Sequence, residues 1–102
     1  MAAVEYSDFV PCDLQDIARF LTRSDARMAA RFLDAVDDTV RFLAVNRHAG
    51  PERLDVPVPD LRAWSVDGFP RYLIFYRAEP SGIHVIRVLH ASRDFKSVFP
   101  SE

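Results

Sequence analysis

The chain has a single cysteine, Cys12, only three glycines, and no apolar run near the roughly 18 residues that cross a bilayer. One cysteine cannot form an internal disulfide, nor can it supply the several thiolates of a structural zinc site. The N-terminal segment lacks the cationic, apolar and small-residue order of a secretion signal. These absences predict a small cytoplasmic protein without disulfide staples.

Lysine is nearly absent as well, because the chain has twelve arginines and one lysine, Lys96. The formal charge of −2 gives no strong positive field that would favour nucleic acid or anionic lipid as a partner. Residues 1–60 hold seven Arg against eleven acidic residues, whereas residues 61–102 hold six basic residues against four acidic ones. The C-terminal part therefore carries the positive end of the molecule.

The first half of the chain predicts two helices. At 102 residues, 49 % of them hydrophobic, residues 1–102 have the size of one domain. The first helix begins near residues 8–11, with Ser7 or Asp8 as its cap, because apolar residues then follow in steps of three and four. These apolar positions are Leu14, Ile17, Ala18 and Leu21.

The second helix is the best-marked element and runs from about residue 25 to 46, with Ser24 or Asp25 as its N-cap. Small residues near its start let the first helix approach closely, so we expect an antiparallel helical hairpin joined around residues 23–25. Its apolar stripe consists of Ala26, Ala29, Leu33, Val36, Val40 and Leu43.

After an extended loop at 46–60, the apolar pattern changes to that of strands. Tight turns are expected at Asp67-Gly68 and at Pro80-Ser81-Gly82. Three strands are therefore predicted, at 61–66, 72–77 and 83–90, and a shorter one at 4–6. The fold class is α+β, with an N-terminal short strand and a helical hairpin packed on an antiparallel sheet of three to four strands.

The predicted central strands carry apolar side chains on both faces, as in a sheet that is covered on both sides. The helical hairpin can cover one face. The other can be covered by the C-terminal tail, by a second copy of the chain or by a partner. We expect a second chain to supply this cover.

The order of helix, helix and three-stranded meander resembles the ParE/RelE superfamily of bacterial toxins. Four stretches carry the resemblance: S-D-F-V-P-C-D-L-Q-D-I at 7–17, Leu61-Arg62, F-P-R-Y-L-I-F-Y-R at 69–77 and I-R-V-L-H-A-S-R-D at 86–94. The last stretch is the most specific, because it is similar to the "I-L-R-V-L-H-x-x-R-D" ending of the ParE branch. Pro11 inside the first helix and Arg47, where family members often have proline, depart from the pattern.

The resemblance implies a toxin that a cognate, ParD-like antitoxin neutralises by direct binding in a hetero-oligomer. ParE-branch toxins are associated with inhibition of DNA gyrase, and RelE-branch toxins with ribosome-dependent cleavage of mRNA. A nuclease of that kind needs dense positive charge, a base and an acid. This chain is acidic overall, and the two aromatic residues of its tail, Phe95 and Phe99, cannot transfer a proton. We therefore favour the ParE branch, a non-enzymatic inhibitor without a cofactor.

Arginine and aromatic residues are the candidates for partner binding, because interface hot spots favour these types. On strands, arginines form either a basic face for an acidic antitoxin segment or solvated, locally paired edge residues. Trp64 either anchors a partner or caps the core. The candidates are Phe20, Phe32, Trp64, Arg71, Tyr72, Arg77, Arg87 and Arg93.

For the nuclease alternative, the catalytic candidates are His90 with Arg77, Arg87 or Arg93. The competing interpretation is that His90 ties the strand end to a turn while Arg93 and Asp94 form a local ion pair or cap. Register decides which residues meet: an even-numbered hairpin loop after Arg77 places Arg77 on the face of His84 and His90, and an odd one on the face of Arg87.

The remaining histidines and the cysteine do not indicate a metal site. His48 and His84 lack ligand spacing with any other His, Asp or Glu, and Cys12 is interpreted as an inert helix residue. No glycine-rich phosphate loop or nucleophile elbow occurs.

Overall fold

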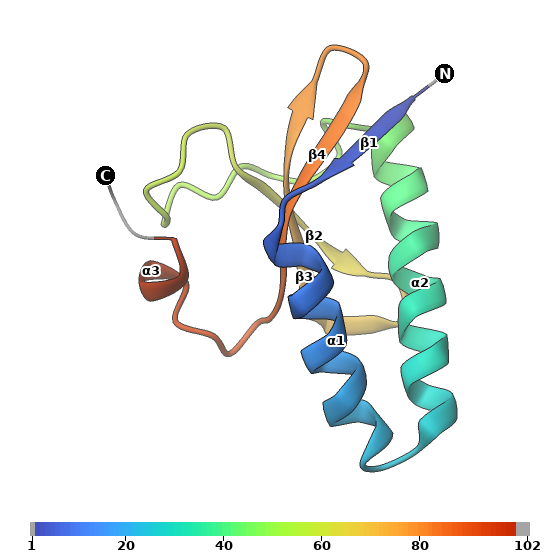
Figure 1. The fold of residues 1–102 in the computed structure, drawn as a ribbon. Helices are drawn as coiled ribbons and strands as arrows, with labels where there is room; N and C mark the ends of the chain where they lie inside the picture. Colours follow the sequence, from blue (N-terminus) through green and yellow to red (C-terminus); the bar gives the residue numbers. More distant parts are fainter. Residues whose placement is uncertain (1, 100–102) are drawn as a thin grey trace.

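The computed structural model describes residues 2–99, which form a four-stranded sheet with a helical hairpin on one face (Figure 1). The sheet order is β1-β4-β3-β2, in which β1 lies parallel to β4 and the other neighbours are antiparallel. The elements are β1 (Ala3–Tyr6), α1 (Phe9–Thr22), α2 (Ala26–Val45), β2 (Arg62–Val66), β3 (Phe69–Glu79), β4 (Gly82–His90) and α3 (Phe95–Val98). The predicted fold class is confirmed, and α3 is an element that the sequence analysis did not predict.

The helical hairpin forms where its sequence predicts it. Asp25 caps α2 from an extended backbone conformation, and its carboxylate accepts the backbone N–H of Arg27 at 2.9 Å. Asp8 precedes α1 without a side-chain cap bond, and Pro11 lies in the first turn, where a missing N–H has no helical acceptor to lose. Among residues 2–99, no helix combines the length and the apolarity needed to cross a membrane.

One extra residue in β4 changes which of its side chains share a face. Phe75 lies opposite Arg87 whereas Tyr76 lies opposite Val85, so Ile86 is a bulge. Before the bulge, Val85 faces the helices; after it, Val88 does. The alternation of β4 therefore shifts by one position between its two ends.

Beyond the end of β1, the edge of β4 is hydrogen-bonded by Ser7, which precedes α1, and by Asp13 in α1. Ser7 Oγ donates a hydrogen bond to the backbone carbonyl of Ile86, and the backbone N–H of Ser7 donates one to the backbone carbonyl of Val85. Asp13 accepts the backbone N–H of Val88. Two residues of the S-D-F-V-P-C-D stretch thus satisfy the backbone groups that the bulge and the short β1 leave open.

The two faces of the sheet carry separate hydrophobic clusters. The helix-side cluster joins α1 and α2 to the sheet, and its fully buried side chains include Phe32, Leu43, Ile74 and Tyr76. The cluster on the opposite face, hereafter the second face, joins Phe75 and Leu89 to loop and tail residues. These cover residues are Val56, Leu61 and Phe99, with Phe95 and Val98 packed against them.

The expectation that a second chain covers the second face is wrong, because the chain covers it itself. Figure 1 shows the loop before β2 and the segment containing α3 on the side of the sheet opposite α1 and α2. The guanidinium of Arg53 lies 5.6 Å from the ring centre of Phe75 and 5.2 Å from that of Phe95, and it is held by Asp55. Loop and tail thereby lock together over the sheet. Of the three covers considered from sequence, the tail is the one present.

Candidate functional site

A hollow of about 350 Å³ lies between α1 and the C-terminal end of β4. We call it the α1–β4 hollow. Its wall combines apolar and polar side chains from α1, β3, β4 and the turn that follows β4. Six of them are Ile17, Phe20, Tyr72, His90, Ser92 and Arg93. Phe20, Tyr72 and Arg93, three of the partner-binding residues proposed from sequence, are therefore brought together.

Exposed aromatic surface and one uncompensated cation distinguish this hollow. Phe20 is 61 % exposed, although it lies on a helix that buries Val10 and Asp13. The two carboxylates of the wall are already compensated, because Asp13 pairs with Arg87 and Asp16 with Arg19. Arg93 is exposed and takes part in none of the ion pairs found among residues 2–99. The hollow therefore offers an apolar wall beside a free positive charge.

His90 is tied into the turn after β4, as one of the two interpretations from sequence proposed. Its Nδ1 accepts the backbone N–H of Ser92 at 3.1 Å and lies 2.8 Å from the hydroxyl of Ser92. The ring also meets Tyr72 edge to face at 5.0 Å. Nδ1 of His90 therefore serves as the hydrogen-bond acceptor that holds the turn. Asp94 caps α3 by accepting the backbone N–H of Lys96.

Of the three arginines considered as partners of His90 in a nuclease, Arg93 lines the same hollow as His90, whereas Arg77 lies far from it. Tyr72 lies opposite His90, and Arg77 lies five residues further along β3, roughly 17 Å away in an extended strand. The turn at Pro80-Ser81 is even-numbered, so Arg77 faces His84 as one register alternative predicts. The Ile86 bulge, however, places His90 on the opposite face from His84, so Arg77 and His90 do not share a face.

Two of the partner-binding candidates expose little or no surface to a partner. Phe32 is completely buried against Phe69 and Tyr72 and belongs to the core. Arg87 forms a largely buried ion pair with Asp13 and lies over the ring of Phe9. The hydrogen bond from Arg87 to Asp13 raises the pKa of its guanidinium. A role of these two residues in partner binding stays a prediction from the sequence.

Arg71 and Arg77 are exposed, and both alternate on β3 with the residues that face the helices. They lie on the second face, flanking Leu73 and Phe75. Tyr72 is itself mostly buried, and this burial raises the pKa of its hydroxyl. It supports the wall of the α1–β4 hollow and offers little area of its own.

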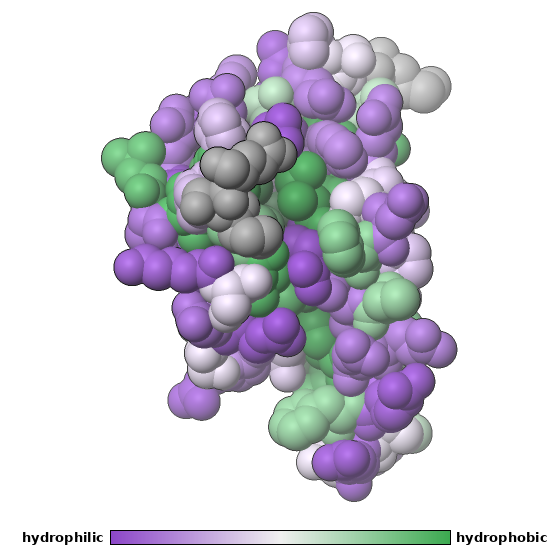
Figure 2. All heavy atoms as spheres, turned by 60° about the vertical axis from the view of Figure 1, so that its left-hand side comes forward, coloured by the Kyte–Doolittle hydropathy of each residue, from purple (hydrophilic) through white to green (hydrophobic). Residues whose placement is uncertain are grey.

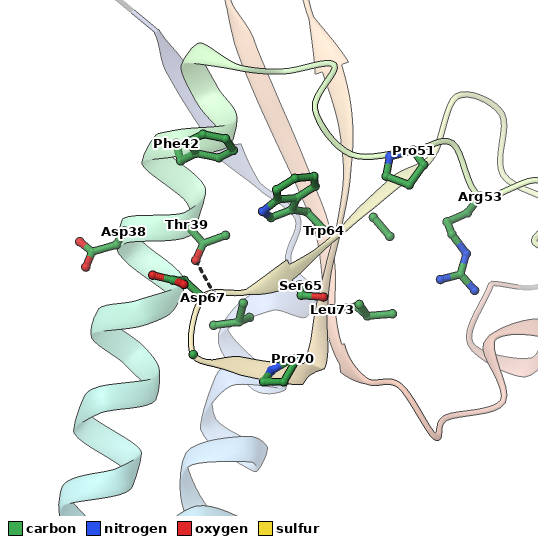
Figure 3. A pocket seen from close by; sticks show the side chains of 13 residues that line it. Asp38, Thr39, Phe42, Pro51, Arg53, Trp64, Ser65, Asp67, Pro70 and Leu73 are labelled. Atoms are coloured by element: carbon green, nitrogen blue, oxygen red, sulfur yellow. Dashed lines mark hydrogen bonds between the residues drawn. The ribbon is translucent and has the colours of Figure 1, made fainter.

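A larger groove, of about 750 Å³, follows the outer edge of β2 (Figure 3). We call it the β2-edge groove. Trp64 stacks on the 45 % exposed ring of Phe42 with ring centres 5.8 Å apart, and these rings form its wall on the helix side. Leu73, Arg53 and Pro51 lie on the other side of the strand in Figure 3. Trp64 thus both packs against the core and contributes to an open surface.

Sequence reasoning missed the roles of Phe42 and Asp13. The role of Phe42 depends on Trp64, which lies far along the chain. The role of Asp13 depends on Arg87, to which nothing in the local sequence connects it. Among residues 2–99, no group of three or more His, Cys, Asp or Glu side chains is placed to hold a metal ion.

Comparison with known proteins agrees with this architecture. A sequence model of the ParE toxin of the type II toxin–antitoxin system parDE matches residues 4–95. Among solved structures, the chromosomal ParDE toxin–antitoxin system from P. aeruginosa is similar at 17 % identity, with a TM-score of 0.73, over 88 % of this chain and 96 % of that one. A search of curated proteins found no match. The family match spans nearly the whole chain, which therefore belongs to the ParE toxins of type II toxin–antitoxin systems.

Proposed function

We propose that this toxin inhibits DNA gyrase in the cytoplasm and is neutralised by a ParD-like antitoxin that binds the α1–β4 hollow. The observation that carries the antitoxin part is Phe20, a large apolar side chain left 61 % exposed beside the free cation Arg93. An antitoxin segment that presents an apolar side chain next to a carboxylate would complement both. Aromatic and arginine side chains in a hollow are the usual anchors of protein interfaces.

The helical hairpin carries further exposed apolar side chains. Phe9 and Leu33 are 61 % and 41 % exposed on the helical hairpin. Figure 2 shows hydrophobic atoms reaching the surface among polar ones, down to the end of the molecule where the α1–α2 turn lies in Figure 1. A helix or extended segment of the antitoxin that crosses α1 would cover this surface.

Inhibition of gyrase without catalysis is favoured over RNA cleavage by the position of His90. A general base needs a lone pair within reach of the 2′-hydroxyl, whereas His90 Nδ1 accepts the backbone N–H of Ser92. Of the candidate partners of His90, Arg77 lies far along β3 and Arg87 is paired with Asp13, so that Arg93 alone of the three is a free cation beside His90. We expect primer extension on RNA from cells induced for the toxin to show no new ends within codons. Cuts within translated codons would support the nuclease alternative instead.

The proposal is tested by expressing the chain alone and together with the product of the adjacent small gene. We expect growth inhibition by the chain alone, relief by co-expression, and inhibition of supercoiling by purified gyrase. Arg93→Glu should weaken antitoxin binding about tenfold or more, because a free cation in the hollow is replaced by a charge that repels the antitoxin carboxylate.

Arg23→Glu is the matched control, since Arg23 is exposed at the end of α1 and lies outside the hollow. Equal loss of affinity in both variants would show a general charge effect rather than recognition in the hollow. Normal growth at high expression without any partner would contradict the toxin function of this chain.

A further inference from the structure

The β2-edge groove differs from the α1–β4 hollow in backbone geometry and in charge. β2 is an edge strand, and only its first half is paired on the outer side. There the loop runs antiparallel to it: Arg53 N–H donates to Leu61 O at 2.7 Å, and Ala63 N–H donates to Pro51 O at 3.2 Å. The pairing ends at this point, because the loop turns away toward α2 at Gly50.

The next outward-facing residue of β2 is Ser65. In a strand, alternate residues direct their backbone groups to the same side, so Ser65 follows Leu61 and Ala63 in pointing away from β3, up to the register shift between Ser65 and Val66. Asp67 N–H is taken by the hydroxyl of Thr39 at 3.0 Å. Ser65 is exposed and lines the groove between the positions where the loop and Thr39 close the edge. An extended segment can pair with its N–H and C=O.

The groove has an apolar wall on each side of the position that an added extended segment would take. Side chains alternate across a strand, so successive residues of an added strand point to opposite walls. On one side they meet the stacked rings of Phe42 and Trp64, and on the other they meet Leu73. This is the arrangement by which extended peptides are recognised at a sheet edge: backbone bonds hold the segment, and pockets select its side chains.

The rim of the groove is acidic. Asp38 and Asp67 are exposed there, and neither takes part in the ion pairs found in the described chain. The one cation of the lining, Arg53, is neutralised by Asp55 through bonds of 2.9 and 2.7 Å. The groove therefore complements arginine or lysine, whereas the α1–β4 hollow with its free Arg93 complements a carboxylate.

We propose that the β2-edge groove binds the target of the toxin, through an extended segment of that protein that carries apolar residues and at least one Arg or Lys. The opposite charges of the two surfaces assign them to two partners: an acidic antitoxin segment in the hollow and a basic target segment in the groove. The assignment rests on the proposed function, because it requires that the chain has both an antitoxin and a target.

Ser65→Pro tests the backbone contact. Proline removes the outward N–H of Ser65 but no hydrogen bond of the β2–β3 ladder, and edge strands accept proline when the lost N–H faces outward. We expect growth inhibition and inhibition of purified gyrase to weaken about tenfold or more, and antitoxin affinity to stay within about threefold. Ser65→Ala, which keeps the N–H, is the matched control and should behave as wild type.

Asp38→Lys combined with Asp67→Asn tests the charge of the rim without touching the backbone. It should weaken target inhibition and leave antitoxin binding unchanged, and Asp34→Lys, an exposed change on α2 outside the groove, should do neither. Circular dichroism and the urea midpoint establish that each variant is folded, so that one destabilised variant does not decide the result.

The other outcomes separate a failure of this inference from a failure of the proposed function. Loss of antitoxin binding in the groove variants would assign the groove to the antitoxin, and unchanged inhibition in all of them would show that the target does not bind there. Growth inhibition that persists while gyrase is unaffected would refute only the gyrase target, because the groove variants can still be scored in cells. A wild-type chain that does not inhibit growth overturns both the proposed function and this inference.

Discussion

Asp13 and Arg87 join the first helix to the last strand, 74 residues apart, through two hydrogen bonds of 2.8 Å each. The same carboxylate accepts the backbone N–H of Val88 at 3.1 Å, beside the Ile86 bulge. The side chains of Asp13 and Arg87 are 8 % and 16 % exposed, so water could solvate little of either charge if its partner were removed. The pair anchors the helix that forms one wall of the α1–β4 hollow.

Asp13→Asn should lower the free energy of unfolding by about 3 kcal/mol, because a largely buried guanidinium loses its counter-charge. Urea denaturation at neutral pH measures this loss. Asp16→Asn is the matched control on the same helix: its ion pair with Arg19 is 3.7 Å long and mostly exposed, so the expected change is below about 0.5 kcal/mol. Equal effects of the two substitutions would show that burial of the Asp13 pair contributes nothing.

The hydroxyl of Tyr76 gives a second prediction, about the loop that leads into β2. It accepts the backbone N–H of Gly50 at 2.9 Å, within the core. Tyr76→Phe should cost about 1–3 kcal/mol of unfolding free energy, because that buried N–H loses its acceptor. The substitution leaves the ring in place, so the loss reports the hydrogen bond and not a cavity.

Gly50→Ala should also destabilise the protein, for a steric reason. A Cβ at position 50 would lie 2.7 Å from the carbonyl oxygen of Ala63 and 2.8 Å from the hydroxyl of Tyr76, so the loop backbone has to move. We expect a cost of about 1–3 kcal/mol, measured by urea denaturation. In the double variant Gly50→Ala/Tyr76→Phe the two costs should not add, because both changes act on one contact. Additive costs would show that the two residues act independently.

Periodicity and turn residues predicted both helices, the four strands and the Asp67-Gly68 turn, because these depend on local spacing. The Ile86 bulge could not be predicted, since an extra residue in a strand is visible only in its pairing with Phe75 and Tyr76. The burial of Phe32 and the pairing of Arg87 with Asp13 could not be predicted for the same reason, because both depend on elements far along the chain. Phe20, Tyr72 and Arg93 were grouped by residue type, and the fold brings them into one hollow.

Acid should weaken the contact between the loop before β2 and the C-terminal tail, in which Arg53, held by Asp55, lies over the ring of Phe95. The hydrogen bonds from Arg53 lower the pKa of Asp55 from 3.8 to about 2. A carboxyl whose pKa is lower in the folded state stabilises it above the unfolded pKa, and this contribution disappears as pH falls from about 4 to 2. Because the side chain of Asp55 is 55 % exposed, we expect only a few tenths of a kcal/mol.

The measurement is a difference between two proteins, because other carboxyls titrate in the same range. Wild type should lose more unfolding free energy than Asp55→Asn between pH 5 and pH 2.5, by the small amount given above. Asp34→Asn removes an exposed carboxyl outside the Arg53–Asp55 pair, so this variant should lose as much unfolding free energy as wild type. A loss in Asp55→Asn equal to that of wild type would show that the Arg53–Asp55 pair does not contribute.

Phe99→Ala tests the conclusion that the chain covers the second face of its own sheet. Phe99 is 5 % exposed, and its ring centre lies 5.2 Å from that of Phe75, so its removal should cost about 2–4 kcal/mol and uncover apolar strand residues. Wild type should therefore bind little of the dye ANS and the variant clearly more, as read by fluorescence. Leu54→Ala, at an 88 % exposed position of the covering loop, should leave both stability and dye binding unchanged. Strong ANS binding by the wild-type chain, abolished when the antitoxin is added, would show that a second chain covers this face.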